Sequence, residues 1–232
     1  MKKIIIAAPN RDDFHAENVA TLLRLTTEAC QCNVFPLFLN VQSTYIDQGR
    51  NAIAETINNS DYDYWITVDT DVALLNSREQ NIVKHLIESG KDFVSGIYVN
   101  RKFPHHPQIY KMNEGKTFDA ILEYPADKMF EVDAVGAGFM FMTKKVLDSF
   151  TSDIIDEGGL PFNFINYATP THQGEDMAFC TRVRKNGIKI YADPSLQLVH
   201  FGKQGYTMDD FRMVQEIATE NEISQQAANS VR

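Results

Sequence analysis

The chain has 232 residues, 44% of them hydrophobic, which is enough for one large domain or two small ones around an ordinary apolar core. Its 22 basic and 31 acidic residues give a formal net charge of −9, which excludes a broad cationic surface for nucleic acid. The cysteines Cys30, Cys32 and Cys180 lack metal-ligand spacing, so we expect buried thiols in a reducing compartment and no structural disulfide.

The N-terminal segment predicts a strand. Its apolar run, Ile4–Pro9, gives way at once to polar and charged residues and is too short for a signal peptide. No apolar run approaches the length needed to span a bilayer. We therefore expect a soluble, cytoplasmic protein, with peripheral membrane contact left open.

The first hundred residues have a βαβ rhythm, which predicts a nucleotide-binding α/β unit with right-handed crossovers. The glycine that follows the third predicted helix, Gly90, is typical of a helix C-terminus. In chain order, we expect a strand at 3–8, a helix at 15–30, a strand ending at 39, a helix at 47–58, a strand at 64–68, a helix at 77–89 and a strand at 93–98.

From about residue 103 the pattern changes to short extended runs separated by prolines and polar turns. We expect one domain over 1–206, with a nucleotide-binding half at 1–100, an acceptor or catalytic half at 101–206, and a helical tail at 207–232. The elements predicted for this mixed second half are an extended run at 108–112, an apolar segment at 132–142, a loop at 151–173, a helix at 174–186 closed by Gly187, and strands near 188–192 and 196–200.

Two aspartates, Asp69 and Asp71, follow directly after the apolar strand predicted at 64–68. Alternate residues on an extended chain point the same way and lie about 6 to 7 Å apart, so both carboxylates can converge on one hard cation. Ligands of open α/β sheets bind beyond the carboxyl ends of the strands, and metal–diphosphate chemistry fits that position. The alternative is that both aspartates only terminate the strand and form a turn.

A second acidic pair, Glu175 and Asp176, opens a predicted helix. Helical spacing places Asp176 on the same face as Phe179, Cys180 and Val183 and turns Glu175 about 100° away. A carboxylate on that inward face should have a raised pKa, as a general base requires. The alternative is that both residues only favour the helix dipole.

His200 ends the last predicted strand. Neutral imidazole binds Mn²⁺ well beside carboxylates, so His200 is a candidate metal ligand, and a hydrogen-bonded structural histidine is the alternative. Arg50 leads a helix at the same sheet edge as Asp69 and is expected near a bound nucleotide, with a solvated surface arginine as the alternative.

Several short motifs follow one another along residues 3–205. In chain order they are Ala8-Pro9-Asn10-Arg11, Gln48-Gly49-Arg50-Asn51, Asp69-Thr70-Asp71, Val135-Gly136-Ala137-Gly138-Phe139, Gly174-Glu175-Asp176-Met177-Ala178-Phe179-Cys180 with Arg182 and Gly187, and Ala192-Asp193-Pro194 before His200. Together they resemble the GT-A glycosyltransferases, and within them the family-2-like branch. The sequence departs from that pattern in two ways, because Thr70 replaces a small residue and the long acceptor domain of many relatives is lacking.

The resemblance implies a GT-A (Rossmann-like) α/β sheet that binds a nucleotide sugar, flanked by helices, with a mixed second half. It implies transfer of a sugar from a nucleotide diphosphate sugar, expected to be a UDP-sugar, to a glycan or other hydroxyl acceptor. Mn²⁺ or Mg²⁺ would be the cofactor, and the transfer would be inverting.

The resemblance also implies residue roles. Asp176 would be the base, with Glu175 beside it in the catalytic pair. Asp71 would be the main metal ligand, with His200 a further ligand. The nucleotide-sugar and metal-loop contacts would come from Ala8, Pro9, Arg11, Arg50, Asp69, Thr70, Gly136 and Gly138, of which Asp69 lies nearer the ribose and the metal waters.

Two other classes stay open. A haloacid-dehalogenase-like phosphatase would use Asp69 as its nucleophile, although that motif normally follows the first strand and here two strand–helix units precede it. A non-catalytic module that binds a nucleotide sugar would keep the fold without turnover. The donor sugar, the acceptor and the oligomeric state are not specified by the sequence.

Overall fold

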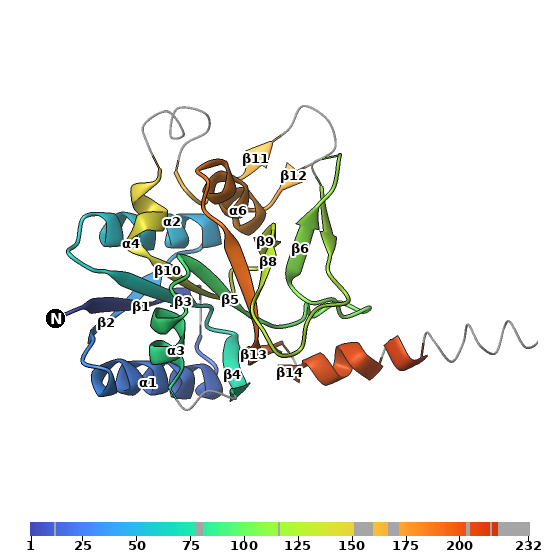
Figure 1. Ribbon diagram of the computed structural model, residues 1–232, viewed down its shortest axis with the longest axis horizontal. Coiled ribbons are helices and arrows are strands. Elements are labelled where there is room, and N and C mark those ends of the chain that lie inside the picture. The colour runs from blue at the N-terminus through green and yellow to red at the C-terminus, as the bar shows by residue number, and fades with distance from the viewer. Residues whose placement is uncertain are drawn as a thin grey trace, which may run out of the picture.

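Helices and strands largely alternate along the first half of the chain, and several short strands precede the helix α6 and the long strand β13 in the second (Figure 1). The computed structural model describes residues 1–11, 13–77, 81–115, 117–150, 160–166, 172–202, 205–213 and 215–217. Its named helices are α1 (Ala16–Gln31), α2 (Ile46–Asn58), α3 (Ile82–Glu88), α4 (Lys144–Asp148) and α6 (Glu175–Lys185). Its strands are β1 (Lys3–Asn10), β2 (Phe35–Gln42), β3 (Tyr64–Val68), β4 (Val72–Ser77), β5 (Phe93–Ile97), β6 (Ile109–Met112), β7 (Phe118–Ala120), β8 (Phe130–Val132), β9 (Ala134–Val135), β10 (Phe139–Thr143), β11 (Ile165–Asn166), β12 (His172–Gln173), β13 (Ile190–Phe201) and β14 (Gly205–Tyr206).

One central sheet combines strands from both halves. Within the described residues it has nine strands, in the order β14-β13-β5-β10-β3-β1-β2, with β4 and β8 also paired to β13. The contacts β2–β1, β1–β3 and β5–β13 are parallel, whereas β10 runs antiparallel between β3 and β5. This arrangement confirms the predicted α/β class with a mixed second half.

The core lies on both faces of this sheet because β1 is apolar throughout. Ile4 and Ile6 pack into one cluster with α1 and α3, and Ile5 and Ala7 pack into the other with α2, α4 and α6. Alternate strand residues point to opposite faces, so a run with no polar interruption fits a strand covered on both sides. Figure 1 shows α1 and α3 below the sheet and α2 and α4 above it.

The predicted helix ends at Gly90 and Gly187 are confirmed. Both glycines have left-handed backbone angles, with φ of 64° and 77°. A side chain at either position would be strained, and the left-handed turn ends each helix without that strain.

Two local predictions were wrong. The helix expected at 77–89 is the shorter α3, and the residues after Asp71 form β4, which a sequence window cannot anticipate because its partner is the distant β13. The two strands expected near 188–192 and 196–200 are one strand, β13, whose pairing with β5 jumps from Asp193 opposite Gly96 to Gln197 opposite Ile97.

The loop expected at 151–173 lies largely outside the described residues, which add only β11 and β12 there. Of the three cysteines expected to be buried, only Cys180 is; Cys30 is exposed and Cys32 is half-buried. All three thiols are free. Of the helical tail, 208–213 and 215–217 are helical, and Met208 and Phe211 pack into the core.

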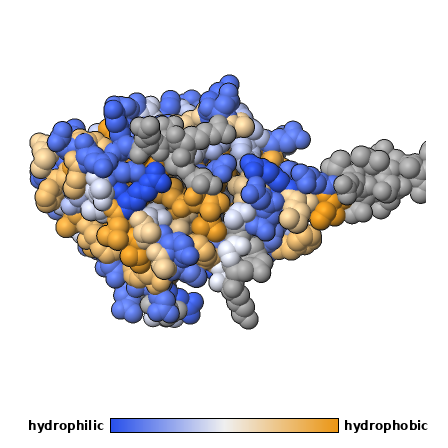
Figure 2. All heavy atoms as spheres, turned by 90° about the horizontal axis from the view of Figure 1, so that it is seen from below, coloured by the Kyte–Doolittle hydropathy of each residue, from blue (hydrophilic) through white to orange (hydrophobic). Residues whose placement is uncertain are grey.

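Strand β2 lies at one edge of the sheet and exposes apolar side chains. Phe35, Leu37 and Phe38 are each more than 40% exposed. Figure 2, which views the molecule from the side of α1, shows apolar side chains at the end where β2 lies. None of the helices in the part of the chain that the structure describes is both long and apolar enough to cross a membrane.

Candidate active site

A cleft of about 340 Å³ opens at the carboxyl ends of β1 and β3 and collects most of the predicted site residues. Its lining is Pro9, Arg11, Ile46, Arg50, Asp69, Thr70, Asp71, Tyr98, Arg101, Gln108, Ala137, Glu175, Asp176 and His200. The two acidic pairs therefore face one space, although more than 100 residues separate them in the sequence. Among the predicted site residues, Ala8 is fully buried in the core, and Gly136 and Gly138 are absent from this lining.

Arg50 joins the two acidic pairs from within the protein. Its Nη2 donates to both carboxylate oxygens of Asp69, at 2.8 and 2.7 Å, and its Nη1 donates to Glu175. Arg50 is only 4% exposed, so the alternative of a solvated surface arginine is wrong. Burial raises the pKa of Asp69, and the nearby guanidinium opposes that rise. Through its bonds to Asp69 and Glu175, Arg50 connects the end of β3 to the start of α6.

Replacing Arg50 by alanine should destabilise the fold. The change leaves two partly buried carboxylates without their counter-ion, and we expect the free energy of unfolding to fall by about 3 kcal/mol, the lower end for broken buried pairs because both carboxylates border the cleft. Urea unfolding of the wild type and the variant measures this change in the free energy of unfolding. The control is Arg212→Ala, whose exposed pair with Asp209 should matter by less than about 1 kcal/mol. Equal effects would contradict the structural role of Arg50.

Asp71 faces a histidine and an arginine. His200 Nε2 lies 3.6 Å from Asp71 Oδ2, and Arg101 Nη1 donates to the same oxygen at 2.9 Å. Burial alone would raise the pKa of Asp71, but His200 and Arg101 hold it below its ordinary value. His200 Nδ1 lies 3.0 Å from the carbonyl oxygen of Val99, which can only accept, so Nδ1 carries a proton and Nε2 is the nitrogen that faces Asp71.

The glycines on either side of Ala137 accommodate a tyrosine. A Cβ on Gly136 would lie 2.3 Å from Tyr98 Oη, and one on Gly138 would lie 2.7 Å from the Tyr98 ring. The Gly138 amide donates to Tyr98 Oη at 2.9 Å, and the Gly138 carbonyl accepts from the Asp69 amide at 3.0 Å. Tyr98 therefore fills the space into which a side chain at Gly136 or Gly138 would project, and Ala137 is the residue of this turn that borders the cleft.

Asp176 is the second residue of α6 and lines the cleft. Burial, followed by the negative charge of Glu175, raises the pKa of Asp176 to about 6, although Arg50 opposes the shift. The predicted direction of the shift is thus confirmed. Glu175 also lines the cleft, contrary to the expected turn away from it, because Arg50 holds its carboxylate there.

This raised pKa predicts a pH-dependent stability difference. Between about pH 4 and pH 6 the folded chain keeps a proton on Asp176 that the unfolded chain has released, so stability falls as the pH rises through this window. Asp176→Asn removes the ionisation, and the variant should be more stable than the wild type at pH 7.5 by roughly 1 to 3 kcal/mol. Urea unfolding at pH 4 and pH 7.5 tests this, and a difference that is the same at both values would contradict it.

Tyr98, Arg101 and Gln108 also line the cleft and were not predicted from the sequence. A signal was available for the first two, because they lie at or just after the carboxyl end of β5, the same sheet edge as Asp69. Gln108 gave none, since it lies in an irregular stretch whose path depends on tertiary contacts.

Comparisons with known proteins extend the fold description. No family model and no curated protein sequence matches the chain. Among solved structures, A197 from STIV matches with a TM-score of 0.51 and 19% identity, over 87% of this chain and 86% of that one. The two proteins share a fold.

Two further matches have lower TM-scores. A Drosophila β-1,4-galactosyltransferase 7 mutant, in complex with manganese, UDP-Gal and xylobiose, matches at 0.44 with 15% identity, over 83% of this chain and 65% of that one. A UDP-glucose pyrophosphorylase with UDP-glucose matches at 0.47 with 8% identity, over 95% of this chain and 99% of that one.

Proposed function

We propose that the chain is a metal-dependent glycosyltransferase that moves a sugar from a nucleotide diphosphate sugar, with UDP as the expected nucleotide, to an acceptor hydroxyl. The observation that carries this proposal is the meeting of Asp71, His200 and Asp176 in one cleft. The carboxyl group of Asp176, whose pKa is raised, faces the same cleft as Asp71 and His200.

The residues around Asp71 fit a divalent cation. The Asp71 carboxylate and the His200 imidazole are ligand types that Mn²⁺ accepts. In the described ranges, no three His, Cys, Asp or Glu side chains are grouped so that they could hold a metal ion by themselves. That suits a cation of the Mg²⁺ type, which uses one or two carboxylates and takes its other ligands from substrate phosphates and water. When bound, the cation would neutralise negative charge that develops on the leaving diphosphate.

The charge of the cleft favours the same cofactor. Its described lining contains three arginines, Arg11, Arg50 and Arg101, and four carboxylates, so the formal charge is −1 with neutral His200. A diphosphate would be repelled by that charge, and a divalent cation reverses it to +1.

Asp176 has the chemistry of the general base. A carboxylate with a pKa of about 6 is ionised at neutral pH and still basic enough to accept the proton of an acceptor hydroxyl. Attack on the sugar from the side opposite the diphosphate would invert the anomeric centre, by analogy with inverting glycoside chemistry. Arg50 and Glu175 would hold the start of α6 in position for this step.

The phosphatase alternative is disfavoured by Asp69. Both of its carboxylate oxygens accept from Arg50, and a nucleophile needs one of them free. A non-catalytic module that binds a nucleotide sugar keeps all the contacts described above and differs only in turnover.

A thermal-shift screen of nucleotide sugars, with and without Mn²⁺, tests the proposal. A ligand that binds only the folded chain raises its unfolding temperature by mass action. We expect a UDP-sugar to raise the unfolding temperature only when Mn²⁺ is present. Slow hydrolysis of that donor by the purified protein would then distinguish an enzyme from a binding module without turnover. No stabilisation by any nucleotide sugar with Mn²⁺ would overturn the proposed function.

A further inference from the structure

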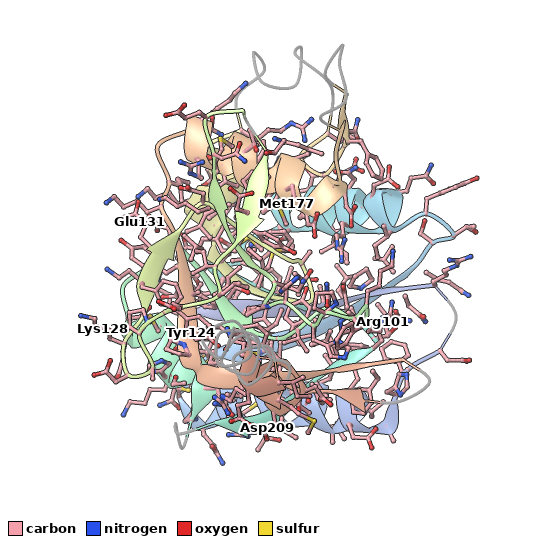
Figure 3. The ribbon with its side chains drawn as sticks, turned by 90° about the vertical axis from the view of Figure 1, so that its right-hand side faces the viewer. Arg101, Tyr124, Lys128, Glu131, Met177 and Asp209 are labelled. Carbon is pink, nitrogen blue, oxygen red and sulfur yellow. The ribbon has the colours of Figure 1, made fainter. Side chains whose placement is uncertain are left out.

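Arg101 lies on the segment after β5, at the rim of the cleft. Its Nη1 donates to Asp71 Oδ2 at 2.9 Å and to the Phe201 carbonyl oxygen at 3.0 Å. In the view of Figure 3, Arg101 lies below Met177 of α6 and well apart from Tyr124, Lys128 and Glu131. The guanidinium therefore bridges the loop after β3 and the end of β13, which carry the two candidate metal ligands.

The carboxylate oxygen of Asp71 that accepts from Arg101 is the same oxygen that faces His200. His200 Nε2 lies 3.6 Å from the same Asp71 Oδ2, and the other ring nitrogen, Nδ1, is bound to the Val99 carbonyl oxygen. A cation shared by this oxygen and this nitrogen would take the positive charge that Arg101 now supplies. The guanidinium and a divalent cation thus compete for one carboxylate.

The ion pair between Arg101 and Asp71 is also easily broken. The side chains of Arg101 and Asp71 are 46% and 31% exposed. Exposed ion pairs change an equilibrium constant by no more than about five-fold, so a cation can displace Arg101 readily.

After displacement from Asp71, the Arg101 side chain would still lie beside the diphosphate of the donor. A cation of the Mg²⁺ type is held by one or two carboxylates together with substrate phosphates, so a diphosphate on a cation at Asp71 would lie close to Arg101. The planar guanidinium fork matches two phosphate oxygens, and this pairing is stronger than a half-exposed one with a single carboxylate oxygen.

We propose that Arg101, resting on the proposed function of this cleft, is a diphosphate-binding residue that occupies the cation position on Asp71 until metal and nucleotide arrive. It changes partner on binding, from the Asp71 carboxylate to the phosphate oxygens of the donor. It therefore opposes binding of the metal alone and favours binding of the nucleotide to the metal-loaded protein.

Two titrations of the full chain test this exchange. Mn²⁺ alone is titrated with electron paramagnetic resonance of free Mn²⁺, and UDP is titrated by calorimetry at saturating Mn²⁺. Arg101→Ala should bind Mn²⁺ about 2- to 5-fold more tightly, because a competitor is gone, and UDP about 10- to 100-fold more weakly. Arg101→Lys, which keeps the charge without the fork, should lie between wild type and alanine in both titrations.

Lys102→Ala is the matched control, since it removes an exposed neighbouring cation and should change neither titration. Opposite signs in the two titrations of Arg101→Ala support the exchange. Effects of the same sign, which a merely structural role would give, overturn it, as does an unchanged affinity for UDP. Failure of the proposed function is distinguishable, because the wild-type chain itself would then bind no UDP in the presence of Mn²⁺.

Discussion

Asp176→Asn should lower the rate of sugar transfer by about 10² to 10⁴-fold, the usual contribution of a general base. The amide keeps the shape of the carboxyl group and cannot accept the acceptor proton. UDP and Mn²⁺ affinities should stay close to those of the wild type, because Asp71 and His200 are unchanged. Initial rates with the donor found by the thermal-shift screen give the measurement.

The pH dependence gives an independent check on the base. Since the pKa of Asp176 is about 6, the wild-type rate should fall as the pH drops through that value, and the variant should lose this limb. Glu175→Gln is the comparison, because that carboxylate is already paired with Arg50 and should matter less to the proton transfer. A larger loss in Glu175→Gln than in Asp176→Asn, or a product with retained anomeric configuration, would refute the assignment.

Asp71→Ala should abolish Mn²⁺-dependent binding of UDP. The residue offers the carboxylate that faces His200, and its loss leaves the cation with a single protein ligand of the proposed pair. The fold should survive, because Asp71 is partly exposed and forms its main-chain bond to Phe201 through its own carbonyl group. Calorimetry of UDP with Mn²⁺ and with EDTA measures the effect.

Asp61→Ala is the control for this experiment. Asp61 precedes β3 at the opposite end of the strand, and its exposed carboxylate pairs only with the side chain of Lys3 in the described contacts. It should bind UDP as the wild type does. Tight binding of UDP to the wild type in the presence of EDTA would contradict the proposed dependence on a divalent cation.

The sequence was most informative where one element decides the outcome. The apolar run of β1, the glycines after α3 and α6, and the inward phase of Asp176 all depend on local geometry. The position of the Asp69 loop followed from a general rule for the edges of α/β sheets. These signals were sufficient to predict the fold class and to place both acidic pairs near one cleft.

The remaining features depend on contacts between distant segments. Arg50 could be placed at the correct sheet edge, but its burial against Asp69 and Glu175 follows from how α6 packs. Tyr98 fills the space beside two glycines that a local argument assigns to a ligand. Strand β4 exists because β13 supplies its partner, and no periodicity within its own six residues separates it from a helix start.

The irregular pairing of β13 decides which way His200 points. Four steps along β13, from Asp193 to Gln197, match a single step along β5, from Gly96 to Ile97. Three residues are therefore extra, and an odd insertion exchanges the two faces of a strand for everything that follows. Proline at the first extra position suits this, since it has no amide proton to offer a neighbouring strand. The imidazole reaches the cleft by this change of parity, and an uninterrupted strand would have directed it to the other side of the sheet.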